Sequence, residues 1–220
     1  TGLYAYVETD IGHRLVRSEL EQIERRTRNI LPLPRVSADA LAQADPSAAG
    51  LAKYLFDNGG FPIYANTHAS YYPTGEESIS ALLDEFEQAQ KFIFIEFFII
   101  DEGTVWDSVL EILKRKVAEG VEVRVMYDGT DAVFRLPYRY PEKLRAMGIQ
   151  CKMFSPLRPL VSTHYNNRDH RKIVVIDGHT AFTGGVNLAD EYVNATHPYG
   201  YWKDTAILIK GEAVRSFTLM

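Results

Sequence analysis

The sequence predicts an α/β fold, with a mixed, mostly central β-sheet flanked by helices on both faces. Segments with the apolar pattern of strands alternate along the chain with segments of helical periodicity. Several strand segments, such as residues 92–100, are apolar on both faces, which is typical of strands covered on both sides. The hydrophobic and charged shares, 46% and 24%, are ordinary for a folded domain.

The first 60 residues are predicted to be a helical and linker segment that precedes an α/β domain of residues 61–220. Residues 14–30 have the charged, moderately amphipathic pattern of an exposed helix, which prolines end. Residues 31–46 contain three prolines and are predicted to be a linker. Residues 47–60 predict a short helix ended by an Asn-Gly-Gly triplet.

Strands and helices are predicted to alternate in the rest of the chain. Thr74, with Glu77 three residues later, indicates the start of one helix, and Thr104 and Gly120 bound another. Helices are predicted at 74–90, 104–120 and 140–148, and strands within 61–73 and at 91–100, 121–129, 149–154, 171–177, 179–185 and 204–210.

The composition argues against several classes of protein. A net charge of -5 and a pI of about 5.7 do not favour nucleic-acid binding through bulk charge. The single cysteine, Cys151, allows neither an internal disulfide nor a cysteine metal cluster. The most apolar run contains Glu96 and is far shorter than the about 20 residues of a membrane span. Because the chain begins with Thr1 and ends within a periodic segment, we expect it to be a piece of a longer protein.

The strands predicted at 171–177 and 179–185 are joined at Asp177-Gly178 and are predicted to form a hairpin. This hairpin brings together three chemically useful side chains. Alternation along a strand places His170 and Lys172 on one face. A two-residue turn at 177–178 would put His170 opposite Gly185 and Asn187 diagonal to it on the same face. A shift of one residue in this pairing would reverse the face of every side chain in the second strand.

Each of these residues has a use at a phosphate group. A neutral imidazole such as that of His170 is available near neutral pH and can attack phosphorus. Lys172 supplies a positive charge, and Asn187 supplies an amide donor for the non-bridging oxygens. Gly184 and Gly185 allow a tetrahedral group to approach the backbone. The arrangement requires no metal or other cofactor. The alternative is a surface hairpin with charge near its open end.

These residues resemble a known family. HRKIVVID, residues 170–177, fits the H-x-K-x-x-x-x-D signature of the phospholipase D superfamily, and GGVN, residues 184–187, resembles its downstream glycine-asparagine element. Similarity to bacterial cardiolipin synthases extends over about residues 60 to 215. It is carried by IEFFII at 95–100, YDG at 127–129, NNRDHRK at 166–172, GGVNLADEY at 184–192 and YWKDT at 201–205.

The resemblance implies one phospholipase D-like half-domain of a phosphatidyltransferase at the cytoplasmic face of a bacterial membrane. In that family a histidine attacks the phosphodiester of one phospholipid, and a hydroxyl of a second, usually phosphatidylglycerol, takes the phosphatidyl group and forms cardiolipin. The active site needs two such motifs, so a second half of the natural chain or a second copy must supply the other. A phosphodiesterase acting on phospholipid or nucleic acid, or a catalytically silent half-domain, are the alternatives.

The signature implies catalytic roles for His170, Lys172 and Asp177. It implies phosphate binding by Lys172, Asn187 and the two glycines at 184 and 185. From the residues alone, Asp177 falls on the opposite parity from His170 and begins the turn, so turn formation is the favoured interpretation of it.

Carboxylates near the motif are predicted to support it. Glu96 lies within an apolar strand, so it must be paired or line a wet cavity. By resemblance it lines the cleft and bonds to a catalytic histidine, and the alternative is a structural salt bridge. Glu191 is predicted to orient a histidine in the same way, with Asp190 as the competing residue or as a helix cap.

Two groups of arginines are candidates for contact with lipid head groups. Arg25, Arg26 and Arg28 lie on the N-terminal helix, and Arg135, Arg139 and Arg158 lie among aromatics and prolines. For both groups a solvated surface is the simpler interpretation. Tyr201 and Trp202 resemble an aromatic pair of the family and are predicted to pack. His164 precedes the motif, and lining of an entrance is the less favoured interpretation.

Overall fold

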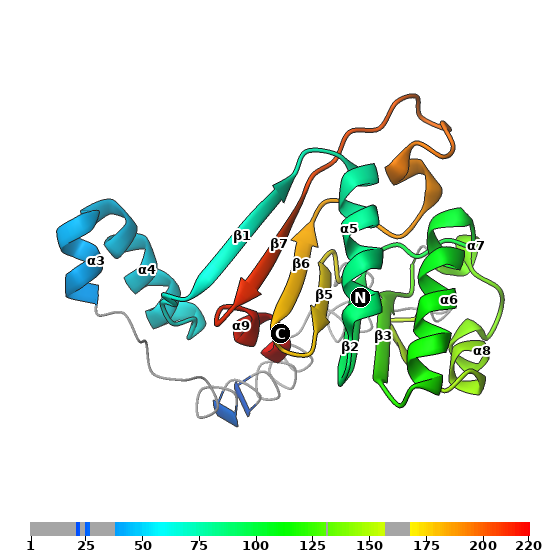
Figure 1. Ribbon diagram of the computed structural model, residues 1–220, viewed down its shortest axis with the longest axis horizontal. Coiled ribbons are helices and arrows are strands. Elements are labelled where there is room, and N and C mark those ends of the chain that lie inside the picture. The colour runs from blue at the N-terminus through cyan, green and yellow to red at the C-terminus, as the bar shows by residue number, and fades with distance from the viewer. Residues whose placement is uncertain (1–20, 23–24, 27–37, 131, 157–167) are drawn as a thin grey trace, which may run out of the picture.

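The computed structural model describes residues 21–22, 25–26, 38–130, 132–156 and 168–220. These residues contain a mixed seven-stranded sheet with helices on both faces, so the predicted fold class is confirmed (Figure 1). The strands lie in the order β1-β7-β6-β5-β2-β3-β4. Their bounds are β1 Thr67–Tyr72, β2 Phe92–Phe97, β3 Glu122–Asp128, β4 Gln150–Phe154, β5 Lys172–Ile176, β6 Thr180–Gly184 and β7 Ala206–Gly211.

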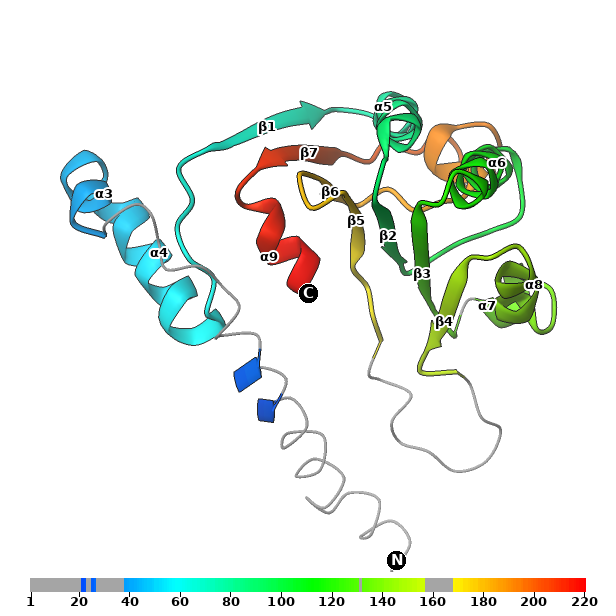
Figure 2. The ribbon, with the colours of Figure 1, turned by 60° about the horizontal axis from the view of Figure 1, so that its bottom comes forward.

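The helices divide unevenly between the two faces of the sheet. Helices α5 and α6 cover one face, and α9 covers part of the other, as Figure 2 shows. The helices are α3 Ala38–Ala44, α4 Pro46–Gly59, α5 Gly75–Gln88, α6 Thr104–Ala118, α7 Ala132–Arg135, α8 Tyr140–Ala146 and α9 Val214–Leu219, with a 3-10 helix, η2, at Asp190–Val193. The larger core lies on the side of α5 and α6, where alternate residues of β2 are buried.

Strand direction brings several chain segments to one edge of the sheet. Strands β2, β3 and β4 are parallel, and β5 runs antiparallel to β2. Strand β5 therefore begins at the edge where the three parallel strands end. Strand β6 is antiparallel to β5 and ends at the same edge. We call this the carboxyl edge, because side chains from the ends of β2, β3, β4 and β6 and from the start of β5 can meet there.

The N-terminal part differs in one respect from its prediction. Residues 31–46 do not form a continuous linker, because 38–44 are helical; their sequence, ADALAQA, is rich in the strongest helix former. The helix predicted at 47–60 is confirmed as α4, whose N-terminal amides are capped by Asp45 and which ends at Gly60 in the left-handed region, φ 73°. The helix predicted at 14–30 lies mostly outside the described residues.

The connection of the β5–β6 hairpin is one residue longer than the predicted two-residue turn, because His179 does not pair in the ladder. His179 N–H donates to Ile176 O at 3.1 Å, which closes the expected Asp-Gly turn. The ladder nevertheless pairs Ile176 with Thr180, so His179 is an extra residue and forms a bulge. Its carbonyl accepts from Gly211 of β7 instead. The predicted pairing of the two strands is therefore wrong by one residue.

Asp177 fastens this turn to the start of the central strand. Its carboxylate accepts hydrogen bonds from the backbone N–H groups of Gln90 at 2.8 Å, Lys91 at 2.7 Å and Phe92 at 2.8 Å. Three amides that precede or begin β2 are thus satisfied by one side chain from a segment about 85 residues later. The backbone of Asp177 itself is left-handed, φ 54°, which an aspartate tolerates.

We predict that Asp177→Ala lowers the free energy of unfolding by about 1–3 kcal/mol, because it leaves three N–H groups, one of them part-buried, without their charged acceptor. Urea denaturation of the 220-residue chain measures this. Asp84→Ala, at an exposed position on α5, is the matched control and should change stability by less than about 0.5 kcal/mol. Equal midpoints for the two variants would contradict the anchoring role.

Candidate active site

His170 and Lys172 lie where β5 begins, at the carboxyl edge. His170 is exposed to solvent, and its ring lies 4.8 Å from the ring of Phe98. Lys172 is buried; its Nζ donates to the carbonyl of His170 at 2.9 Å and lies 5.3 Å from the centroid of the Phe98 ring. The buried ammonium of Lys172 is therefore held at the backbone of the exposed His170, and the Phe98 ring lies near both side chains.

Burial changes the pKa of Lys172. Desolvation lowers the pKa of Lys172 from its ordinary value, while the carboxylates of Asp204 and Asp169 oppose this shift. Asp204 was not singled out from the sequence. Asp204 is the acidic residue of the YWKDT segment, immediately before β7. It comes near Lys172 only in the folded sheet, in which β6 lies between β7 and β5.

Asn187 reaches the carboxyl edge by a different route from the predicted one. With the observed pairing, strict alternation would have turned Asn187 away from the face of Lys172. The chain instead leaves the ladder after Gly184 and crosses the end of β2. There the buried Asn187 accepts from Ile99 N–H at 3.0 Å. Its place thus follows from the loop after β6, and the alternation argument for it is wrong.

Close approach of the backbone explains the two glycines. A Cβ atom on Gly184 would lie 2.4 Å from Thr205 O, and one on Gly185 would lie 1.9 Å from Asp204 Oδ1. Real Cβ atoms do not approach other atoms so closely, so no larger residue fits at Gly184, where the contact is with backbone, and a larger residue at Gly185 would displace the Asp204 carboxylate. The absence of a side chain at these two positions therefore leaves room for the start of β7 and for the Asp204 carboxylate.

Asp128 holds the segment that leads into the motif. This fully buried carboxylate ends β3 and accepts from Asp169 N–H at 3.1 Å, Arg168 Nη1 at 3.2 Å and Thr130 N–H at 2.8 Å. The backbone on the N-terminal side of His170 is thereby tied to the end of β3. Asp128 is part of the YDG segment that carried the family resemblance, but its anchoring role was not predicted.

Glu96 lies on the face of the sheet opposite Lys172. It pairs across the ladder with Ile173, whereas Lys172 pairs with Phe97, so the two side chains point to different sides. Its Oε1 lies 2.6 Å from Nε of Arg171, which also bonds to Asp169 Oδ1 at 3.0 Å. The predicted bond from Glu96 to a histidine is therefore replaced by a carboxylate–arginine cluster.

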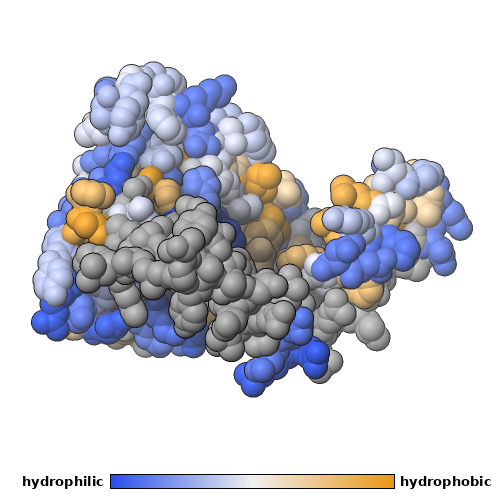
Figure 3. Space-filling model, turned by 180° about the vertical axis from the view of Figure 1, so that it is seen from behind, coloured by the Kyte–Doolittle hydropathy of each residue, from blue (hydrophilic) through white to orange (hydrophobic). Residues whose placement is uncertain are grey.

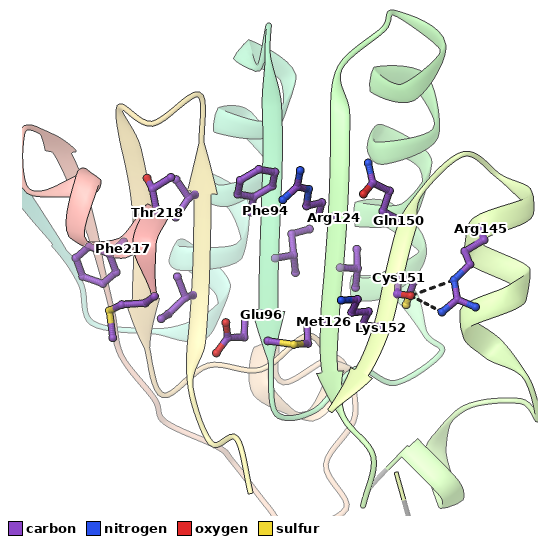
Figure 4. Close-up of a pocket in the computed structure, with 15 residues that line it drawn as sticks. Phe94, Glu96, Arg124, Met126, Arg145, Gln150, Cys151, Lys152, Phe217 and Thr218 are labelled. Atoms are coloured by element: carbon purple, nitrogen blue, oxygen red, sulfur yellow. Dashed lines mark hydrogen bonds between the residues drawn. The ribbon is translucent and has the colours of Figure 1, made fainter. Parts of the chain in front are cut away.

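The surroundings of Glu96 favour its protonated form. Burial and the neighbouring carboxylate of Asp169 raise the pKa of Glu96 to about 8, and Arg171 opposes this only in part. Glu96 also lines a trough of about 550 Å³ on this face, together with apolar residues of β2, β3 and α9 (Figure 4). The trough lies across the sheet from Lys172.

The remaining predicted carboxylates have structural partners. Asp190 caps α6, accepting from Thr104 N–H at 3.1 Å and Val105 N–H at 2.8 Å, so the capping alternative is correct. Glu191 pairs with Arg135 at 2.8 Å rather than with a histidine. Asp177 lies at the far end of β5, seven residues or roughly 20 Å along the strand from His170, and so has no contact with the carboxyl edge.

The other predicted positions are only partly described. Trp202 packs against Tyr192 with ring centroids 5.2 Å apart, whereas Tyr201 is exposed. Residues 157–167, which include Arg158 and His164, and Arg28 lie outside the described residues. In the described part of the chain, no three His, Cys, Asp or Glu side chains are arranged to hold a metal ion. No helix there is long and apolar enough to cross a membrane.

Comparisons with known proteins identify the family of this chain. Residues 82–211 match the family described as "Cardiolipin synthase, PLD-like domain". The chain belongs to this family. A cardiolipin synthase of Geobacillus thermodenitrificans is 39% identical over 176 residues, which are 80% of this chain and 35% of that protein. An uncharacterized protein of Streptococcus mutans is 48% identical over 98% of this chain and 47% of its own length. The phospholipase D-like chain thus spans from a third to a half of these relatives.

Solved structures share the fold of this phospholipase D-like chain. A phosphatidylserine synthase of Haemophilus influenzae has a TM-score of 0.57 at 15% identity, over 90% of this chain and 39% of that one. Nuc, a phospholipase D family member of Salmonella typhimurium, has a TM-score of 0.50 at 16% identity, over 70% of this chain and 89% of that one. At these identities the likeness concerns the fold.

The protonation of Glu96 predicts a pH dependence of stability. The folded chain keeps the Glu96 proton up to about pH 8, whereas the unfolded chain releases it near 4.5, so this group's stabilisation falls as pH rises between those values. Glu96→Gln should therefore raise the free energy of unfolding relative to wild type at pH 8 by about 1–3 kcal/mol, and by less at pH 5. Urea denaturation at both pH values measures the difference, with Asp84→Asn as a control that should show none. A Gln variant with the wild-type pH slope would contradict the assignment.

Proposed function

We propose that the full-length protein is a phosphatidyltransferase that makes cardiolipin from phosphatidylglycerol at a bacterial membrane. Membership of the cardiolipin synthase family supports this class of reaction. The observation that carries the proposal is the pairing of an accessible imidazole, His170, with a buried ammonium, Lys172, at the carboxyl edge. Solvent access suits a group that must meet a substrate, and burial suits a charge that must stay fixed.

The first step forms a covalent intermediate. An imidazole nitrogen attacks the phosphorus of phosphatidylglycerol, forming a P–N bond, and the P–O bond to the glycerol head group breaks. The glycerol oxygen leaves with a proton from an acid. Lys172 and the amide of Asn187 stabilise the charge that develops on the non-bridging oxygens. The ammonium is already held by the His170 carbonyl, so it needs little reorganisation.

The second step transfers the phosphatidyl group. A glycerol hydroxyl of another phosphatidylglycerol attacks the phosphorus, gives its proton to a base and displaces the histidine, so that two phosphatidylglycerols yield one cardiolipin and one glycerol. One histidine cannot be both nucleophile and acid–base, so the reaction needs a second motif. His170 fills one of these two roles. The relatives are a little more than twice as long as this chain, which leaves room for a second half.

The remaining residues support the site indirectly in this proposal. Asp128 positions the backbone before His170, and Gly185 admits Asp204 near Lys172, where its negative charge favours the ammonium form. Asp177 contributes to the stability of the strand and not to the reaction.

The reaction can be tested directly on the natural full-length protein. Supplied with labelled phosphatidylglycerol in detergent, without added metal, it should release cardiolipin and glycerol in equal amounts. Formation of phosphatidic acid in place of cardiolipin would show that water is the acceptor and would replace the transferase with a phosphodiesterase.

Removal of the imidazole should abolish turnover without loss of the fold. His170→Ala is expected to lower kcat by at least about 10³-fold, because the nucleophile or the acid–base is lost. The urea midpoint should not change, because the side chain is exposed. His179→Ala removes another exposed histidine, at the opposite end of the hairpin, and should keep full activity. A His170 variant with the wild-type rate would reject the proposed role.

A further inference from the structure

The segment between β3 and α8 presents three exposed apolar side chains near the carboxyl edge. Val133 and Phe134 lie on α7, Tyr138 lies on the following loop, and they are 57%, 86% and 95% exposed. We call these three residues the α7 patch. Figure 3 shows apolar side chains exposed at the flank opposite the α3–α4 pair, where Figure 1 places α7. Large apolar groups exposed together mark an interaction surface.

The α7 patch stands on a fixed support. Ala132 and Leu136 of the same turn are buried. Arg135 Nη1 donates to Asp101 Oδ2 at 2.7 Å and to Glu191 Oε1 at 2.8 Å, which ties the turn to the end of β2 and to η2. The inward side chains are thus packed or ion-paired, while the outward ones are apolar. Little ordering entropy remains to be lost when the patch meets a partner.

Charges beside the α7 patch are balanced. Arg139 lies 3.6 Å from Glu142, and Lys143 lies 3.0 Å from Glu102. Among the residues that the structure describes, these two pairs leave no net charge beside the patch with which to attract an anionic partner. Any binding through the patch must come from burial of apolar surface and should depend little on salt.

We propose that the α7 patch docks the carboxyl edge onto a phospholipid bilayer, with Phe134 and Tyr138 entering the boundary between head groups and acyl chains. This occupant rests on the proposed function, because the phosphodiester that His170 attacks lies at head-group depth. The patch follows β3 and His170 precedes β5, so both lie at the edge where β3 ends and β5 begins, and insertion of the patch brings His170 toward that depth. An exposed phenylalanine beside a tyrosine suits this layer, where one end of a ring is apolar and the other is wet.

Co-sedimentation of the 220-residue chain with phosphatidylcholine vesicles, and with vesicles that also contain phosphatidylglycerol, tests the docking. Wild type should bind both, with less than a twofold change between about 0.1 and 0.5 M NaCl. The double variant Phe134→Ser, Tyr138→Ser should lower the partition coefficient by about tenfold or more. This assay needs no catalysis. Vesicle binding by an inactive protein would reject the proposed function alone, and absence of vesicle binding by wild type would reject the docking alone.

A second double variant is the matched control. Leu51 and Tyr54 on α4 are 62% and 63% exposed, and α4 precedes the start of β1, which lies at the opposite edge of the sheet. Leu51→Ser, Tyr54→Ser should bind vesicles within twofold of wild type. Equal loss in the two double variants, or no loss in the α7 variant, would overturn the proposal. So would an α7 variant of the full-length protein that binds vesicles normally but unfolds at lower urea, because the patch would then be an interface with another protein domain.

Discussion

The buried carboxylate of Asp128 is the constraint on which the geometry of the site depends. His170 precedes β5 and is not held by the ladder, so its backbone needs another anchor. Asp128 supplies it by accepting from the amide of Asp169, while Lys172 donates to the carbonyl of His170 from the other side. Hydrogen bonds thus fix the backbone at the Asp169 N–H group and at the His170 carbonyl, while the His170 ring is exposed to solvent. Such an arrangement suits a group that must react.

Two aspartates therefore hold the motif strand, one near each end. Asp128 ties the segment before β5 to the end of β3, and Asp177 ties the turn after β5 to the start of β2. Both act through backbone amides, which are insensitive to the identity of the neighbouring side chains. The aspartate that closes the motif is thereby explained as an anchor of the strand that carries the histidine and lysine.

The two faces of the sheet carry different ionisable groups near the carboxyl edge. Lys172 belongs to the face packed by α5 and α6, where desolvation lowers the pKa of its ammonium. Glu96 belongs to the other face, where a carboxyl group kept neutral lines the trough beside α9. Both η2 and α7 follow strands, β6 and β3, that end at the carboxyl edge. The proposed transfer reaction and the proposed docking are consistent with each other, because each needs this edge to face the lipid.

The sequence by itself determined the fold class, most of the strands and helices, and the candidate imidazole, ammonium and amide. These follow from local periodicity, capping residues and the residue types and spacing of segments 170–177 and 184–187. It did not determine the pairing of the hairpin, because the bulge at His179 is stabilised by β7, about 30 residues later. The partners of Glu96, Glu191 and Asp177, and the approach of Asp204 to Gly185, were decided only by the tertiary structure. Each of those contacts joins segments distant in sequence, and a charged side chain takes whichever partner the folded sheet brings within reach.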